Sequence, residues 1–353
     1  MSKTLIKYLF LVLWCFLILE IAARIVINIQ PFYERYIKNV SEAGHRLDLV
    51  KSLKNSYLNS NHTIKQYHPT RGQCVQPNIS DYYYYKNKIV NTNSRGIRGK
   101  MEYDYEKKPG QTRVLILGDS YTFGLEVSDN ETYPYYLQQL LPQSEIMNFG
   151  VSGYGHDQML IYLQEEGVKY HPDIVILGFH ESNGERNLLD IFYKPKPRFL
   201  LSNGRLVLLN SPVQNKEDVL IGEFWRSKLF DLISILRYNF MKKMGMLKEE
   251  SRKITYRILQ ELVDTARQNH AQVIFVYLND IFTATANNEL TQDEAEFAAM
   301  CKKINVPIIF STHLDKSLKK KGYLKEGHYA PFVYQHIAEN IKEYLLRGNV
   351  YSL

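Results

Sequence analysis

Five short apolar runs divide the chain from Thr112 onwards, and helical patterns lie between them. The runs are Val114–Leu117, Ile146–Asn148, Ile174–Gly178, Val273–Leu278 and Val306–Phe310. Continuous runs of this length are typical of strands buried on both faces, as in a parallel sheet. Because such strands alternate here with helices, the sequence predicts a doubly wound α/β fold with a mostly parallel sheet and right-handed crossovers.

Capping patterns mark several of the intervening helices. Ser251 is expected to cap a helix that carries Ile254, Ile258, Leu262 and Ala266 on one face. Thr291 and Glu294 form the pattern of a capping box for the next helix. The last helix is expected over Pro331 to Leu346.

The interval 188–248 breaks this rhythm and is interpreted as an insertion near the active site. Asn203-Gly204 between apolar residues predicts a hairpin, and Ser227 to Met244 has the pattern of an amphipathic helix. Ordinary packing explains the apolar face of that helix, and a lid or an acyl-binding surface is the alternative.

The N-terminal segment 1–29 is strongly apolar from Tyr8 onwards, with Lys3 and Lys7 before it. Glu20 and Arg24 interrupt it at a helical i, i+4 spacing that allows them to pair. A membrane anchor that stays in the protein and a cleaved signal peptide both fit this pattern. Either interpretation predicts that the bulk of the chain is exported.

Residues 30–108 are expected to form a stalk and an irregular extension, with helical character to about residue 70. Tyr82 to Tyr85 form a run of four tyrosines, which predicts an edge strand or, alternatively, an aromatic surface for sugars. Asn93-Ser94-Arg95-Gly96 has the composition of a turn.

Composition and charge exclude several classes. The net charge of +7 comes from 44 basic and 37 acidic residues over 353 positions, and no nucleic-acid-binding module is apparent. With Cys15 in the apolar segment, Cys74 and Cys301 are left to pair or to stay as free thiols, without the spacing of a disulfide framework. His180-Glu181 opens like a zinc-protease motif, but Gly184 stands where the second His belongs. We therefore expect no metal and no cofactor.

Four residues at the ends of these predicted elements suit a serine nucleophile. Ser120 follows the first strand in Gly118-Asp119-Ser120, at the sheet edge where open α/β sheets bind their ligands. Gly153 follows the second strand and Asn183 the third, so a backbone N–H and a side-chain amide can join the Ser120 N–H as an oxyanion hole. His328, just before the last helix, is placed to act as the base.

In this order, the four residues resemble the SGNH (GDSL-type) hydrolase superfamily. The resemblance covers about Arg113 to Leu346, predicts a hydrolase-like domain at 109–347, and implies a flavodoxin-like sheet. It also implies Ser120 as nucleophile, with the Ser120 N–H, the Gly153 N–H and the Asn183 side chain as oxyanion donors, and His328 as base. The flanks are similar to those of membrane-anchored bacterial members, which are often associated with surface-polysaccharide modification.

The sequence departs from the family pattern at two positions. Gly184 follows Asn183 where the family has Asp, and Lys325 stands three residues before His328, where the family has its triad acid. Glu326 is the nearest carboxylate and is the candidate acid. A backbone carbonyl in its place and Asp315 are the alternatives.

The resemblance and the apolar N-terminus together predict an exported, membrane-anchored serine esterase. We expect it to remove acyl groups, acetyl in particular, from a carbohydrate or a related small ester. An O-acyltransferase that modifies a surface polysaccharide with assembly partners is one alternative, because water and a sugar hydroxyl are interchangeable acceptors. A non-catalytic glycan-binding protein on the same fold is the other, motivated by Gly184 and Lys325.

Overall fold

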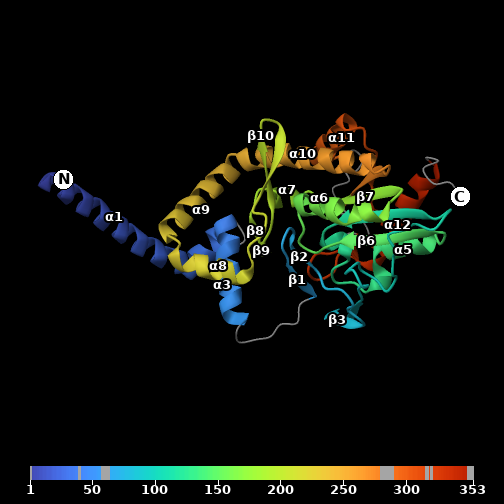
Figure 1. The fold of residues 1–353 in the computed structure, drawn as a ribbon, viewed down its shortest axis with the longest axis horizontal. Helices are drawn as coiled ribbons and strands as arrows, with labels where there is room; N and C mark the ends of the chain where they lie inside the picture. The colour runs from blue at the N-terminus through green and yellow to red at the C-terminus, as the bar shows by residue number, and fades with distance from the viewer. Residues whose placement is uncertain are drawn as a thin grey trace.

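A five-stranded parallel sheet forms the centre of the part of the chain that this computed structural model describes, namely residues 2–38, 41–56, 64–278, 290–314, 318 and 321–347 (Figure 1). The spatial order is β13-β12-β7-β5-β6, with every neighbouring pair parallel. This is the flavodoxin-like order 2-1-3-4-5, so the predicted doubly wound fold is confirmed. The strands are β5 (Thr112–Gly118), β6 (Ser144–Gly150), β7 (Ile174–Phe179), β12 (Gln272–Tyr277) and β13 (Ile308–Phe310).

Helices cover both faces of the sheet, which explains why its strands are apolar without alternation. On β5, Leu115 and Leu117 pack into one cluster of buried residues, while Val114 and Ile116 pack into the other. One face carries α6 (His156–Glu165), α10 (Met246–Gln268) and α11 (Gln292–Lys303); the opposite face carries α5 (Tyr133–Leu140) and α12 (Pro331–Arg347).

Two of the helix-start predictions have different outcomes. The capping box of Thr291 and Glu294 is present at the start of α11. Ser251 is wrong as a cap, because α10 begins five residues earlier, at Met246, and Ser251 lies buried inside it. The break in the chain is at Gly245, whose φ of 72° is the left-handed conformation that glycine adopts without strain.

The described part of the N-terminal region contains three helices and two small hairpins. Helix α1 (Lys3–Asn28) is apolar and long enough to cross a membrane, and it projects from the rest of the molecule in Figure 1. The predicted Glu20–Arg24 pair is present at 2.8 Å. The chain continues through α2 (Gln30–Tyr36), α3 (Glu42–Ser56), the hairpin of β1 (Lys65–His68) with β2 (Gly72–Val75), and the hairpin of β3 (Tyr82–Tyr85) with β4 (Lys88–Val90).

The insertion between β7 and β12 contains two further hairpins and two helices. The predicted hairpin is formed by β10 (Arg198–Ser202) and β11 (Arg205–Leu209), with Asn203 and Gly204 both at positive φ. The predicted amphipathic helix is α9 (Lys228–Lys243). The remaining elements are β8 (Ile191–Phe192), β9 (Lys194–Pro195) and α8 (Lys216–Trp225). Cys74 and Cys301 are free thiols.

Candidate active site

The turn after β5 carries Ser120 as the first residue of a short helix, α4 (Ser120–Phe123). Close packing requires glycine at position 118, because a Cβ there would lie 1.9 Å from Thr122 Oγ1. The buried Asp119 carboxylate accepts the Tyr121 N–H at 3.0 Å and so closes the start of the helix. Ser120 thus lies at the carboxyl end of β5, where the strand order of the sheet reverses and where such sheets bind ligands.

His328 reaches Ser120 from the loop before α12. Its Nε2 lies 3.0 Å from Ser120 Oγ, within the range for proton transfer between a base and a nucleophile. The two residues are separated by more than 200 positions in the chain, and the parallel sheet brings their loops to one edge.

The carboxylate at the other imidazole nitrogen belongs to Glu126, not to Glu326. Glu126 Oε2 lies 3.1 Å from His328 Nδ1 and 3.2 Å from the His328 backbone N, and its Oε1 accepts the Glu326 N–H at 3.0 Å. The exposed Glu326 side chain instead accepts the Tyr85 hydroxyl at 2.7 Å. The prediction that Glu326 is the candidate acid is therefore wrong, and Glu126 takes its place. The alternative, Asp315, lies outside the described residues.

Glu126 is held on a strained loop by Arg98. The loop turns sharply, since Glu126 has a φ of 71°, which is uncommon for a residue with a side chain. The buried Arg98 guanidinium donates to the carbonyls of Phe123, Gly124 (2.7 Å) and Val127 (2.8 Å), which flank Glu126 on both sides. Arg98 belongs to the 30–108 extension, so this extension is part of the site and not only a stalk.

The predicted oxyanion donors lie after β6 and β7. Gly153 has a φ of 86°, a conformation that favours glycine. Asn183 begins α7 (Asn183–Arg186) and is fully buried. Neither its Nδ2 nor its Oδ1 has a hydrogen-bond partner among the described residues. A buried amide without a partner costs about 1–3 kcal/mol, which favours a role in holding a ligand.

Lys65, on β1, contacts the peptide group that carries the Gly153 N–H. Its ammonium donates to the Ser152 carbonyl at 2.6 Å, and this carbonyl and the Gly153 N–H belong to one peptide unit. Hydrogen bonds polarise one another, so a donor at the carbonyl strengthens the N–H as a donor. Burial and the neighbouring charges of Lys194 and Arg186 lower the pKa of Lys65 to about 7.

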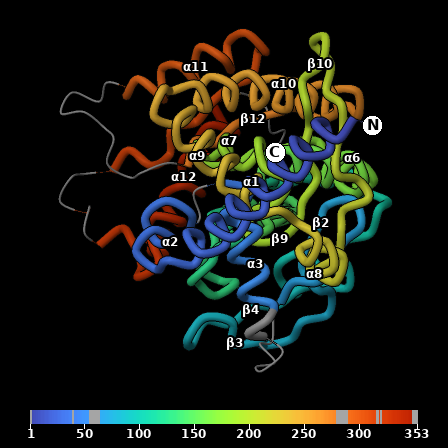
Figure 2. Tube along the Cα trace, turned by 90° about the vertical axis from the view of Figure 1, so that its left-hand side faces the viewer, coloured from blue at the N-terminus to red at the C-terminus, as the bar shows by residue number. Residues whose placement is uncertain are grey.

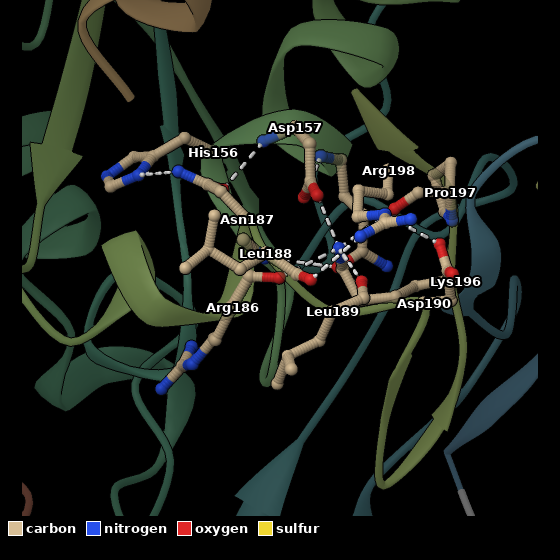
Figure 3. A network of polar contacts seen from close by, with 12 residues as sticks. His156, Asp157, Arg186, Asn187, Leu188, Leu189, Asp190, Lys196, Pro197 and Arg198 are labelled. Atoms are coloured by element: carbon tan, nitrogen blue, oxygen red, sulfur yellow. Dashed lines mark hydrogen bonds and ion pairs between the residues drawn. The ribbon is translucent and has the colours of Figure 1, made fainter. Parts of the chain in front are cut away.

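A buried polar network fixes the segment that follows Asn183 (Figure 3). Lys196 Nζ donates to the carbonyls of Arg186 and Leu189, both at 3.1 Å, and forms an ion pair with Asp157. Asn187 Nδ2 lies 3.2 Å from His156 Nδ1. Burial lowers the pKa of His156 to about 3, so its ring is neutral and Nδ1 accepts this hydrogen bond.

Aromatic rings border the serine. The Tyr121 ring stacks on His180, with centroids 4.6 Å apart and planes within 11° of parallel, and lies 5.0 Å from the His328 ring. His180 also lines a cleft of about 1000 Å³ between α7, α10 and α11. Phe179, Tyr256 and Phe297 contribute apolar surface to this cleft, and Gly184 lines it.

Comparisons with known proteins give likenesses of structure only. No family model and no curated protein matches the chain. The psychrotrophic esterase EstA from Pseudoalteromonas is 12% identical, with a TM-score of 0.41, over 67% of this chain and 98% of the other. A member of the lipolytic protein G-D-S-L family from Veillonella parvula is 13% identical, with a TM-score of 0.39, over 67% of this chain and 99% of the other.

A two-domain esterase active on acetylated mannans is 12% identical, with a TM-score of 0.36, over 69% of this chain and 50% of the other. At such identities and scores the function has to be argued from the side chains of the site.

Proposed function

We propose that this chain is a serine esterase, anchored in the membrane by α1 with its catalytic domain outside the cytoplasm. The observation that carries the proposal is the continuous chain of contacts from Ser120 through His328 to Glu126. Serine, histidine and carboxylate in this order form the arrangement that acyl transfer to serine needs. In this proposal the acid is Glu126, from the loop of Ser120. The absence of an acid at Lys325 therefore no longer argues for a non-catalytic protein.

In the proposed reaction, Ser120 Oγ attacks the ester carbonyl while His328 Nε2 accepts the hydroxyl proton. The carbonyl oxygen becomes an oxyanion facing the N–H groups of Ser120 and Gly153 and the Asn183 amide. His328 returns the proton to the leaving alcohol, which leaves the acyl group on Ser120. Water then attacks this ester, with His328 again as base, and releases a carboxylic acid and free Ser120.

The surroundings of Ser120 favour an acylated carbohydrate as substrate. The stacked Tyr121 and His180 place aromatic rings beside the polar groups of the site, a combination typical of sites that orient small ligands. We propose that the acyl group is small, such as acetyl. An acyltransferase would use the same acyl-enzyme and differs only in the acceptor that resolves it.

The test is hydrolysis of 4-nitrophenyl acetate by the full chain in detergent. Wild type is expected to release acetate and Ser120→Ala to be inactive, and a fluorophosphonate should label Ser120, as read by peptide mass spectrometry. Equal activity of the two proteins, or the absence of a Ser120 adduct, contradicts the proposal. Adding an oligosaccharide acceptor distinguishes the two reactions, because transfer yields acylated sugar in place of acetate.

A further inference from the structure

Large apolar side chains are exposed where α8 meets α9. We call residues 221–230 the α8–α9 corner. Trp225 is 82% exposed, Phe224 76%, Ile221 67% and Phe230 64%. On α9 the exposed apolar surface continues through Ile233, Leu236 and Phe240. Contiguous apolar patches on a protein surface mark interaction sites, so this corner requires an occupant.

The α8–α9 corner contacts the C-terminal half of α1. The Glu20 carboxylate of α1 accepts the Ser227 hydroxyl at 2.6 Å and the backbone N–H groups of Lys228 (2.9 Å) and Leu229 (3.0 Å). The rings of Phe16 and Phe230 lie 6.2 Å apart. Figure 2 views this side of the molecule, where α9 lies beside α1. The exposed surfaces of α1 and of the corner are therefore continuous.

Ion pairs hold the corner in this position. Asp231, near the start of α9, is buried and lies 2.6 Å from Arg46 of α3, 2.8 Å from Arg226 and 3.2 Å from Lys228. Glu223 of α8 also pairs with Arg46. Because these contacts fix both helices, the exposure of Trp225 is imposed by tertiary structure.

The length of α1 indicates where a bilayer would end. The exposed stretch Leu5–Leu19 spans about 22 Å at the α-helical rise, against about 30 Å of hydrocarbon in a bilayer. Beyond Glu20, Ile21 and Ile25 of α1 are also exposed. A bilayer around α1 therefore reaches the level of Glu20, where Ser227 contacts the helix.

We propose that the α8–α9 corner is seated in the bilayer, at the boundary between lipid head groups and acyl chains. The occupant is the lipid surface, because the patch is continuous with the span and lies at its end. Tryptophan and phenylalanine on an amphipathic element are favoured at this depth. The inference rests on α1 crossing the membrane, and it gives the catalytic domain a fixed orientation over the bilayer.

The two tryptophans of the chain, Trp14 and Trp225, allow a direct test. The full-length Trp14→Phe and Trp225→Phe variants each retain one reporter. They are reconstituted in phosphatidylcholine vesicles brominated either near the head group or near the acyl-chain end. The control is Trp14→Phe/Trp225→Phe/Tyr83→Trp, whose new reporter replaces an exposed tyrosine of β3. Unchanged thermal unfolding in detergent shows that each variant is folded.

In the Trp14→Phe variant, head-group-proximal bromine is expected to lower emission about twofold, and more than terminal bromine does. Iodide is expected to quench this variant several-fold less than the Tyr83→Trp control. If neither brominated lipid lowers the emission of Trp225, the proposed seating in the bilayer is refuted. This holds whether iodide quenches Trp225, which shows exposure to water, or does not quench it, which shows shielding by another protein surface. The Trp225→Phe variant retains Trp14 and therefore reports on the depth of α1. If terminal bromine quenches Trp14 while neither lipid quenches Trp225, α1 crosses the membrane and the proposed seating of the α8–α9 corner is refuted.

Discussion

Replacing Glu126 by glutamine tests whether this carboxylate orients the imidazole of His328, the proposed base. In the structure, Oε2 faces the two N–H groups of His328 and Oε1 faces the Glu326 N–H. Glutamine has one oxygen and one NH₂ group, so in either orientation its NH₂ faces an N–H donor. If the NH₂ faces His328, Nδ1 can only accept, and the proton moves to Nε2.

With the proton on Nε2, His328 cannot accept the Ser120 proton. In a comparable triad the amide substitution lowers turnover by about 10⁴. The other orientation keeps the tautomer but leaves the Glu326 N–H unpaired, at a cost of about 1–3 kcal/mol in stability. We therefore expect kcat of Glu126→Gln to fall by about 10³–10⁴, equal to about 4–5.5 kcal/mol of transition-state stabilisation.

The assay is 4-nitrophenyl acetate hydrolysis by purified full-length protein, with thermal unfolding measured in parallel. Glu326→Gln is the matched control, because its side chain contacts Tyr85 and only its backbone N–H touches Glu126. We expect this control to retain wild-type turnover. The reasoning is refuted if Glu126→Gln keeps more than half of the wild-type kcat, or if Glu326→Gln loses as much.

Four further substitutions probe the surroundings of the triad. Asn183→Ala removes a buried amide without a partner among the described residues, so kcat should fall by about 10²–10³ while urea unfolding shows no loss of stability; a destabilised protein with full turnover would contradict an oxyanion role. Arg98→Leu should lower the free energy of unfolding by at least about 3 kcal/mol in the same assay and reduce kcat, because three carbonyls lose a charged donor. The control is Arg95→Leu, at an exposed neighbouring position, which should change neither stability nor kcat. Lys65→Met should lower kcat about tenfold at constant KM, since Lys65 polarises the Gly153 peptide; a change confined to KM would instead indicate substrate contact. His156 has a pKa of about 3 in the folded protein against 6.5 ordinarily, so its protonation favours the unfolded chain. Its contribution to stability is complete above pH 6.5 and is lost as the pH drops towards 3. His156→Gln should therefore reduce the dependence of the melting temperature on pH over this range, and an unchanged dependence would rule out His156 as its source.

The sheet could be predicted from sequence because its chemistry is local. A parallel strand with helices on both faces is apolar at consecutive positions, and the burial of Val114 through Leu117 on both sides of β5 shows the reason for the pattern. The Asn203-Gly204 hairpin was equally accessible, since both positions need positive φ. The start of α10 was wrongly predicted at Ser251, because serine also occurs inside helices. The true start, after Gly245, has no side-chain cap that the sequence could reveal.

The site was predictable where residues follow strand ends or, for His328, immediately precede the last helix. Ser120, Gly153 and Asn183 each stand two to four residues after the end of a strand, and the strand order brings those ends together. Glu126 and Arg98 carry no such signal, because their roles depend on contacts between loops. Glu126 meets His328 across 202 positions, and Arg98 contacts Gly124 across 26.

The position of Glu126 accounts for Lys325, the residue that departs from the pattern of the SGNH hydrolases that the sequence resembles. An acid three residues before His328 has to fold back onto the imidazole from the same loop. Here Glu126, the proposed acid, comes from the loop of Ser120 and accepts the backbone N–H groups of Glu326 and His328, so one carboxylate joins both loops. The side chain at position 325 is then released from this role, and Lys325 lies exposed to solvent. Exchanging Lys325 for Asp would therefore not improve catalysis, because Glu126 already occupies Nδ1; a rise in kcat of Lys325→Asp would show that Glu126 is not the acid.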